Sequence, residues 1–397
     1  MNILTFTSLF PNNVRPHHGI FIKERMTRVA ALPGAVVRVV APVPWFPPLK
    51  LGSRWHYSQV KREERIEGLP VSHPRYLMIP KVGTGWHGPM MAASLRSFVA
   101  ALRARDPFDV IDAHYVYPDG FAAVEIGRVL GTPVVVSARG SDINLFREIP
   151  SVRGHLARTL SGASALIAVS EALAESMRAL GAAPRKIHVI PNGVDARKFR
   201  PVAREAALGR LGLGPGRLLL SVGHLTANKG FDRLLRAFRL LLNLGGHDDV
   251  RVAIVGGGTY RNDLERLVAS LGLSDRVRLA GEVPHAELHL WYAAADLFCL
   301  FSLREGWPNV VLESMACGTP VLATPVGGVP EIVATSQVGA LAEGSDEALA
   351  RAIAQALLRP WDREAIARFA GAHTWERAAE SVHEVLASAA AGDRVPV

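Results

Sequence analysis

The stretch FCLFSLREGWPNVVLESMACGTPVLATPVGGVPEIV, residues 298–333, predicts a strand, a loop, a helix, a second strand, a glycine loop and a further helix. The first strand, 297–300, is short and wholly apolar, as expected of a strand that is buried on both faces of a parallel sheet. Pro308 suits a first helical position, and Gly318 suits the left-handed residue that ends a helix. Alternation of strands and helices indicates an α/β fold.

Two glutamates of this stretch are expected to converge. Glu305 lies on the loop at the carboxyl end of the strand, and Glu313 lies in the second turn of the helix. Helical side chains lean toward the helix N-terminus, so Glu313 should point back toward Glu305. The free backbone N–H groups at the helix start favour an anion. This arrangement suits a sugar joined to a phosphate.

The composition describes a folded protein with anionic partners. The chain has 397 residues, 49% of them hydrophobic and 20% charged, enough for two or three domains with full cores. Cys299 and Cys317 lie in apolar surroundings and predict reduced core residues in a cytoplasmic protein. Met1 leads directly into an apolar strand, unlike a signal peptide, and no apolar run is long enough to span a membrane.

The net charge of +9 favours phosphates or acidic lipids as partners, although an arginine-rich coding bias would explain it equally well. No helix-turn-helix, zinc-finger or aromatic-basic pattern occurs, so nucleic acid is not expected as a partner.

Strands and helices alternate along both halves of the chain. The expected strands of the first half begin at Asn2 and continue at 36–40, 109–114, 134–136, 164–169 and 187–191. Those of the second half lie near residues 218, 252, 277, 297 and 321. This pattern predicts two doubly wound parallel sheets facing each other across a cleft, with a boundary near 195–215. An amphipathic helix, 375–389, is long enough to return to the first domain.

Four residues of the first half are candidates for the site. His114, Arg139 and Asp142 lie at the carboxyl ends of strands, where ligands bind such sheets. Gly19 stands at a strand-to-helix turn, where it would let a ligand approach closely; an ordinary tight turn is the alternative.

Two segments could meet a membrane. Residues 42–57 are rich in proline and aromatics and predict an irregular loop. The loop contains four large apolar residues that could be exposed, Trp45, Phe46, Leu49 and Trp55, and the cations Lys50 and Arg54. A membrane interface and a loop packed on its own domain both remain open. The helix expected at 89–105 has one basic face, and covers a sheet or lies on a membrane surface.

The second half carries a candidate diphosphate site. Lys229 precedes a helix N-terminus in the turn 222–230, where its ammonium and backbone N–H groups can share one diphosphate, and His224 can add a donor. The turn 255–258 is glycine-rich but is not G-x-G-x-x-G, and no P-loop occurs.

Nothing in the sequence predicts a metal. His285 and His289 have the spacing of a metal pair, yet we interpret them as the solvated start of a helix. No Asp-x-Asp pair occurs, so cations and helix ends would have to carry the charge of a departing diphosphate.

In these features the chain resembles family 4 glycosyltransferases of the GT-B fold, over essentially its whole length. The resemblance rests on Glu305 and Glu313 as an E-x7-E signature, Val222-Gly-His-x4-Lys229-Gly230, Pro191-Asn-Gly-Val-Asp195, Gly256 to Gly258, Gly327-Gly328 and Thr374-Trp375-Glu376. It implies two Rossmann-like domains: an acceptor-side domain, 1–198 with the returning segment 375–397, and a nucleotide-sugar domain, 199–374. It also implies transfer from a nucleoside-diphosphate sugar, with retention of configuration and without metal or other cofactor.

The resemblance assigns roles to individual residues. Lys229, with His224, would contact the diphosphate, Glu305 would hold sugar hydroxyls and Glu313 the ribose. The donor site would be completed by Gly19, Gly257, Val283, Gly306, Trp307, Pro308, Asn309 and Val310. Glu305, Lys229, Arg139 and Asp142 would be the catalytic set, and His114 and Arg139 would line the acceptor side.

Two positions depart from the family pattern. Arginine is usual where this chain has His224, which weakens the fixed positive charge and adds a titratable group. Many members have histidine, which helps to orient the donor sugar, where this chain has Arg139. The segments 8–25 and 138–142 resemble those of bacterial surface-polysaccharide transferases of the exopolysaccharide or teichuronic-acid type. The implied acceptor is a glycan or a polyprenyl-linked glycan, and the implied location is the cytoplasm or the inner face of the membrane.

Two other functions remain alternatives at this stage. A sugar-nucleotide epimerase can share the fold and the diphosphate site, although the paired glutamates argue against it. A non-catalytic nucleotide-sugar-binding partner would fit the departures at His224 and Arg139, but the glutamates and Lys229 are intact.

Overall fold

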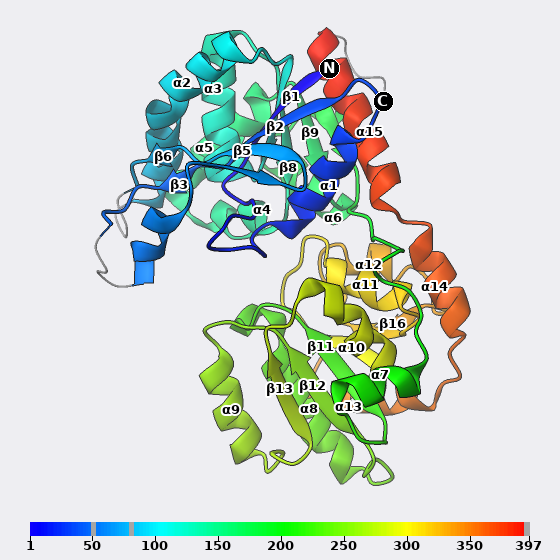
Figure 1. The fold of residues 1–397 in the computed structure, drawn as a ribbon. Helices are drawn as coiled ribbons and strands as arrows, with labels where there is room; N and C mark the ends of the chain where they lie inside the picture. The colour runs from blue at the N-terminus through cyan, green and yellow to red at the C-terminus, as the bar shows by residue number, and fades with distance from the viewer. Residues whose placement is uncertain (49–52, 79–82, 393–397) are drawn as a thin grey trace. The chain divides into compact units, whose positions relative to one another are not determined.

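A computed structural model describes residues 1–48, 53–78 and 83–392. The chain forms two compact units, one of residues 1–192 together with the segment from Trp375 onward, the other Gly193–Thr374 (Figure 1). Each unit has its own sheet and its own hydrophobic core. None of the helices in the described part of the chain is both long enough and apolar enough to cross a lipid bilayer.

The first unit is built on an eight-stranded sheet. Its strands are β1 (Asn2–Phe6), β2 (Val36–Val40), β4 (Glu63–Ile66), β5 (Leu69–Ser72), β7 (Val110–His114), β8 (Val134–Ala138), β9 (Ala165–Ala168) and β10 (Ile187–Val189). They lie in the order β10-β9-β8-β7-β1-β2-β5-β4, and all neighbours are parallel except β4 and β5. The short strands β3 (Val43–Pro44) and β6 (Arg75–Tyr76) pair separately.

Helices cover both faces of this sheet. They are α1 (Ile20–Ala30), α2 (His87–Arg105), α3 (Phe121–Leu130), α4 (Ser141–Asn144), α5 (Pro150–Gly162), α6 (Glu171–Ala179) and α15 (Trp375–Ala391). Helix α2 buries Met91, Leu95, Val99 and Leu102 and contacts α3 and β6, so its apolar face packs within the first unit. Helix α15 packs against α1 and buries Val382 and Leu386 in the core of the first unit. The predicted return of the C-terminal helix to the first domain is confirmed.

The second unit holds a six-stranded parallel sheet. Its strands are β11 (Leu218–Val222), β12 (Arg251–Val255), β13 (Val277–Gly281), β14 (Leu297–Leu300), β15 (Val321–Ala323) and β16 (Gly339–Leu341). Its helices are α7 (Arg204–Leu211), α8 (Phe231–Asn243), α9 (Arg261–Ser270), α10 (Leu288–Ala294), α11 (Asn309–Ala316), α12 (Val329–Ile332), α13 (Asp346–Leu358) and α14 (Arg363–Gly371). Side chains alternate between the faces of each strand, and Leu219, Val252 and Ile254 pack under α8 and α13.

The strand order fixes where a ligand can bind. The second sheet has the order β13-β12-β11-β14-β15-β16, which is the 3-2-1-4-5-6 order of doubly wound nucleotide-binding folds. Its direction reverses between β11 and β14, as that of the first sheet does between β1 and β7. Ligands of such sheets bind beyond the carboxyl ends of the strands at this reversal. The prediction of two doubly wound parallel sheets is therefore confirmed.

Some local predictions were wrong. The segment 42–57 contains the strand β3 and the start of a 3-10 helix, Ser53–Gln59, because β3 finds a partner in β6 across the chain. Leu49 and Lys50, which belong to the same prediction, lie outside the described residues. Pro308 is the residue before α11 and not its first residue. Cys299 and Cys317 are buried and form no disulfide, as expected.

Candidate functional site

An ion pair lies at the reversal point of the second sheet. Lys229 follows β11, and its Nζ donates a hydrogen bond of 2.7 Å to Oε1 of Glu305, which follows β14. The hydroxyl of Ser302 donates to the same oxygen, also at 2.7 Å. The side chain of Glu305 is 8% exposed and that of Lys229 is 25% exposed. The two most important residues of the predicted donor site are therefore in contact.

Backbone bonds hold the loops of Lys229 and Glu305 together. The amide of Leu303 donates to the carbonyl of Asn228 at 2.8 Å, and Nδ2 of Asn228 donates to the carbonyl of Arg304 at 2.9 Å. Gly230, at φ +68°, begins α8; a Cβ there would lie 2.0 Å from the Phe301 carbonyl oxygen. The tight approach therefore requires glycine and fixes Lys229 beside the β14 loop.

The loop that follows β15 supports Glu305 from the other side. A Cβ on Gly327, at φ +54°, would lie 2.0 Å from the carbonyl oxygen of Glu305, and the Gly328 amide donates to the Gly306 carbonyl at 3.0 Å. On the loop between β14 and α11, Trp307 and Pro308 are buried, whereas Gly306 and, at the start of the helix, Asn309 and Val310 are half-buried.

Glu313 has a separate set of partners. The hydroxyl of Tyr292 donates to its Oε2 at 3.0 Å, and Nε2 of His285 lies 3.1 Å from its Oε1. Burial and the neighbouring Glu313 carboxylate raise the pKa of Tyr292, so its hydroxyl stays protonated and donates. The carboxylate of Glu313 is thus held from two sides by residues of α10 and the 3-10 turn before it, His285–Glu287.

His285, Tyr292 and Ser302 were not predicted as site residues. His285 was interpreted as part of a solvated helix start, but it is half-buried and bonded to Glu313. The two residues are 28 positions apart in the sequence, so no local sequence pattern predicts their contact. Nδ1 of His289, in contrast, bonds to the nearby carbonyl of Ala286, at 2.7 Å.

The glycines after β12 pack two turns together. A Cβ on Gly256, at φ +144°, would lie 1.9 Å from the carbonyl oxygen of Gly223, and one on Gly257 would lie 2.2 Å from Oε1 of Glu282. The predicted donor residue Gly257 therefore has a packing role of its own. Val283 is half-buried after β13, and His224 is exposed after β11.

The first unit contains a buried polar cluster at the ends of β7 and β8. Nη2 of Arg139 lies 2.6 Å from Nδ1 of His114, whose Nε2 lies 2.9 Å from Oδ2 of Asp112. Arg139 and Arg25 both donate to Oδ1 of Asn192, at 3.0 and 3.1 Å. The structure thus brings the predicted residues His114 and Arg139 together and adds Arg25, Asp112 and Asn192.

Burial sets the charges in this cluster. It lowers the pKa of His114 to about 4, so the ring is neutral; Nδ1 accepts from Arg139, and Nε2 lies beside the Asp112 carboxylate. Burial also lowers the pKa values of Arg25 and Arg139, yet both guanidinium groups keep their charge as arginines do in proteins. Burial alone would raise the pKa of Asp112, but His114 and the two arginines outweigh it and lower the value.

Asp142 fixes the backbone next to Arg139. Its carboxylate accepts from the amides of Arg139, Gly140 and Val116, at 2.9, 2.8 and 2.8 Å. Arg139 is half-buried, and its guanidinium lies 5.4 Å from the centre of the Phe21 ring. Asp142 therefore holds the backbone at the end of β8 in place through hydrogen bonds to backbone amides.

Gly19 shapes the start of α1. At φ +67° it precedes the helix, and a Cβ there would lie 2.1 Å from the carbonyl oxygen of Leu9. The tight turn by itself accounts for a glycine at this position. An ordinary tight turn was the alternative to close approach of a ligand in the sequence analysis. Among the described residues, no group of three or more His, Cys, Asp and Glu side chains is arranged to hold a metal ion.

Known proteins share both the sequence and the fold. Residues 210–372 match the family described as glycosyl transferases group 1, and residues 56–198 match glycosyltransferase family 4. A protein of Bacillus subtilis, named provisionally as the teichuronic acid biosynthesis glycosyltransferase TuaC, is 30% identical and covers 89% of this chain and 88% of its own. A D-inositol 3-phosphate glycosyltransferase of Catenulispora acidiphila is 34% identical over 74% of this chain and 75% of its own.

Solved structures agree on the fold. A sucrose-phosphate synthase of Thermosynechococcus elongatus superposes with a TM-score of 0.79 at 21% identity, covering 99% of both chains. HepE of Anabaena, solved in complex with UDP, superposes with a TM-score of 0.72 at 22% identity over 98% of this chain and 100% of its own. The two-sheet architecture is therefore the GT-B fold, as predicted. This chain is an enzyme of the glycosyltransferase class and belongs to glycosyltransferase family 4.

Proposed function

We propose that the enzyme transfers a sugar from a nucleoside-diphosphate sugar to a carbohydrate or polyprenyl-linked acceptor, with retention of configuration and without a metal. The observation that carries the proposal is the contact between Lys229 and Glu305 at the sheet reversal. A cation and a carboxylate at that place match the two charged halves of the donor, its diphosphate and its hydroxyl-rich sugar. The structures of HepE with UDP and with UDP-glucose support a donor of this class.

The setting we propose is the synthesis of a cell-surface polysaccharide. The name of the TuaC relative, which refers to teichuronic acid, supports this setting. It also agrees with the resemblance of segments 8–25 and 138–142 to surface-polysaccharide transferases.

Donor binding in this proposal exchanges partners at the ion pair. The ammonium of Lys229 leaves Glu305 for the diphosphate, and the carboxylate of Glu305 turns to the sugar hydroxyls. The N-terminus of α8, directly after Lys229, adds backbone N–H groups and a positive dipole end. Glu313 takes the ribose hydroxyls while Tyr292 holds its second oxygen.

The reaction then needs no separate base. The acceptor oxygen forms a bond to the anomeric carbon on the face from which the diphosphate departs, and the bond between that carbon and the phosphate oxygen breaks. The acceptor proton passes to the departing phosphate oxygen. Lys229 and the start of α8 stabilise the negative charge that develops on the diphosphate. In the first unit, Arg139, held by His114 and Asn192, is the proposed acceptor-side group, and Asp142 positions it.

A donor panel tests the proposed function. The purified enzyme is incubated with radiolabelled UDP-, GDP- and ADP-sugars and a lipid extract that supplies acceptors. We expect one donor to label a lipid or glycan product, and the anomeric configuration of that product to equal that of the donor. Turnover should persist after treatment with a chelator. Absence of a labelled product with every donor, or inversion at the anomeric carbon, would contradict the proposal.

Replacing Glu305 by glutamine is expected to separate product binding from transfer. Lys229 would lose its carboxylate partner, so a nucleoside diphosphate should bind about two- to tenfold more tightly by calorimetry. Transfer should nevertheless fall, because the sugar loses its carboxylate ligand. Ser302→Ala is the matched control, since it removes the other bond to Oε1 and keeps the charge pair. Weaker diphosphate binding in Glu305→Gln would show that Glu305 does not compete with the diphosphate for Lys229.

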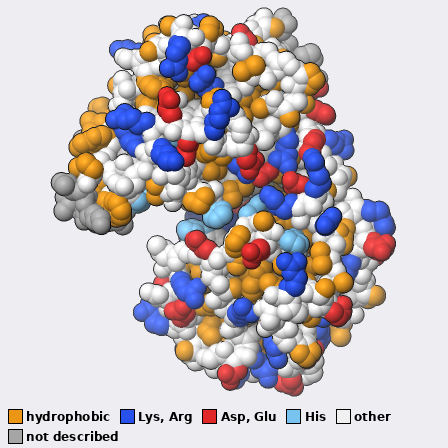
Figure 2. All heavy atoms as spheres, in the orientation of Figure 1, with side chains coloured by type: hydrophobic (Ala, Val, Ile, Leu, Met, Phe, Trp, Pro, Cys, Tyr) orange, Lys and Arg blue, Asp and Glu red, His pale blue; other side chains and the backbone are white. Residues whose placement is uncertain are grey.

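We also propose that the enzyme acts at the cytoplasmic face of the membrane and binds its anionic surface through the first unit. Trp45, Leu77 and Trp86 are 55%, 51% and 66% exposed. The amide of Trp45 bonds to Tyr76, next to Leu77, and Trp86 directly precedes α2. Hydrophobic side chains gather there, over β3, β6 and α2, at the left edge of Figure 2. Arg96 and Arg105 are exposed on α2 and would face lipid phosphates.

Flotation with anionic liposomes at low salt tests this surface. We expect the enzyme to float, and the floating fraction to fall at least about twofold when salt is raised. The variant Trp45→Ser/Trp86→Ser should float less than the wild type. Leu358→Ser is the control, because Leu358 is 76% exposed in the second unit. Failure of the wild type to float, or equal loss in the control, would contradict this proposal.

A further inference from the structure

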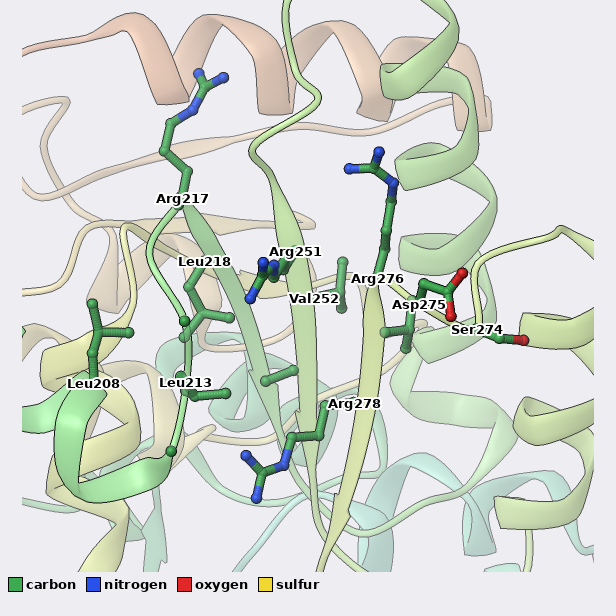
Figure 3. Close-up of a pocket in the computed structure, with 15 residues that line it drawn as sticks. Leu208, Leu213, Arg217, Leu218, Arg251, Val252, Ser274, Asp275, Arg276 and Arg278 are labelled. Carbon is green, nitrogen blue, oxygen red and sulfur yellow. The ribbon is translucent and has the colours of Figure 1, made fainter.

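A second pocket lies at the opposite end of the second sheet from the donor site. Its volume is about 310 Å³, and it is lined where β11, β12 and β13 begin and by the segment 212–216 that follows α7 (Figure 3). The proposed donor residues Lys229 and Glu305 follow the carboxyl ends of strands in the same sheet. No part of the proposed transfer reaction uses this pocket.

Arginines from three neighbouring strands line the pocket. Arg217 precedes β11, Arg251 is the first residue of β12, and Arg276 and Arg278 lie at the start of β13. Strand register places Arg251 beside Leu218, and Arg278 beside Ala253, so these side chains share the sheet face opposite to α8. Arg251 and Arg278 lie within strands of a parallel sheet, whose residues are usually apolar.

Two of these arginines are neutralised by carboxylates. Arg217 makes two bonds to the carboxylate of Asp249, at 2.5 and 2.8 Å. Arg276 donates to the carbonyl of Asp248 and lies 4.0 Å from its carboxylate. These contacts explain Arg217 and Arg276 as parts of the fold.

The other two arginines keep an uncompensated charge. Arg278 donates to the carbonyl of Leu211 at 3.0 Å and lies 5.4 Å from the centre of the Trp291 ring, and neither partner is an anion. The side chain of Arg251 is exposed and makes no hydrogen bond or ion pair with any residue that the structure describes. Figure 3 shows its guanidinium directed toward Leu218, while the carboxylate of Asp275, which also lines the pocket, points away from it.

We propose that this pocket binds a soluble phosphate monoester, such as a sugar phosphate. Two uncompensated guanidinium charges match a phosphate monoester, which carries about −1.5 to −2 at pH 7. Arginine binds phosphate in the bidentate manner that its planar fork allows. Leu208, Leu213 and Leu218 form an apolar wall for the organic part of the ligand, and the volume lies at the small end of the range for ligand pockets.

Calorimetric titration of the full chain with glucose 6-phosphate and with inorganic phosphate tests the site. We expect glucose 6-phosphate to bind, and Arg251→Gln to weaken that binding by about tenfold or more. The double variant Arg251→Gln/Arg278→Gln should abolish it. Arg239→Gln is the matched control, because it removes an exposed cation of α8 in the same unit outside the pocket. Lys229→Gln should bind glucose 6-phosphate normally, which separates this pocket from the proposed donor site.

Three outcomes would overturn the inference. Unchanged affinity of Arg251→Gln for glucose 6-phosphate would show that Arg251 does not bind this ligand. Loss of binding in Lys229→Gln would assign the ligand to the proposed donor site. The third outcome would show that the ligand is a lipid headgroup. The protein would then cosediment with vesicles of phosphatidic acid but not of phosphatidylcholine, and it would not bind glucose 6-phosphate. Circular dichroism confirms that each variant is folded, as expected for the exposed Arg251.

Discussion

Replacing Lys229 by alanine is expected to lower the rate of sugar transfer by about 10²- to 10³-fold, which is the usual cost of losing one preorganised group that stabilises transition-state charge. The ammonium lies directly before α8 and contacts Glu305 across the sheet reversal. In the proposed mechanism no metal stabilises the charge of the leaving diphosphate, so the loss of this cation raises the activation barrier directly. The effect should therefore appear mainly in kcat.

The Lys229→Ala protein should stay folded. The side chain is 25% exposed, and exposed or partly exposed ion pairs add at most about 1 kcal/mol to stability. Glu305 keeps the hydroxyl of Ser302 as a partner. Steady-state kinetics with the donor identified in the panel measure the effect, and Lys229→Arg should restore part of the activity because it restores the charge.

Arg233→Ala is the matched control for Lys229→Ala. Arg233 is a half-buried cation of the first turn of α8, and its guanidinium bonds to the carbonyl of Gly344 at 2.7 Å. Its loss should change transfer less than about threefold, since it belongs to no part of the proposed site. Undiminished transfer in Lys229→Ala would show that the ammonium does not stabilise the leaving diphosphate. An equal loss of transfer in Arg233→Ala would show a general effect on α8.

The second unit was predictable because its signals are local. Strands β11 and β14 are short apolar runs, and the residues that matter, Lys229 and Glu305, stand on the loops after them. Residues that follow parallel strands must meet at one edge of the sheet. The glycines at 230 and 327 reinforced the interpretation, since close backbone contacts require them.

The first-unit cluster was only half predictable because its contacts are long-range. His114 ends β7 and Arg139 follows β8, so both were predicted, whereas Arg25 lies on a helix 167 residues from its partner Asn192. Nothing in the local pattern of α1 distinguishes a buried arginine from an exposed one. Asp112 lies within β7, two residues before His114, and was passed over as part of a buried strand.

Replacing Asp112 by asparagine is expected to lower the free energy of unfolding of the first unit by about 3–5 kcal/mol, because it leaves buried cations without their facing anion. Arg25 is fully buried, and its Nε and Nη1 have no hydrogen-bond partner among the described residues. Asparagine keeps the shape of the side chain and removes only the charge. Hydrogen exchange of the backbone amides of β7 and β8 measures the effect in this unit alone.

The pH dependence of this effect follows from the pKa of Asp112. The value is lowered in the folded state, so the carboxylate stabilises the unit above the ordinary aspartate pKa of about 3.9 and this contribution is lost as pH falls. The difference between the wild type and Asp112→Asn should therefore be largest at neutral pH and shrink below about pH 4.

A second substitution distinguishes charge from shape at Asp112. Arg25→Met in the Asp112→Asn background removes one of the unmatched cations and should recover at least about 1 kcal/mol, since buried ion pairs can be replaced by apolar residues at little cost. Glu148→Gln is the control in the same unit: its pair with Arg147 is exposed, so its loss should change stability by less than about 1 kcal/mol. Unchanged exchange in Asp112→Asn would mean that the buried Asp142 carboxylate compensates both arginines. No recovery in the double variant would assign the loss to the contact with His114, whose Nε2 lies 2.9 Å from Oδ2 of Asp112.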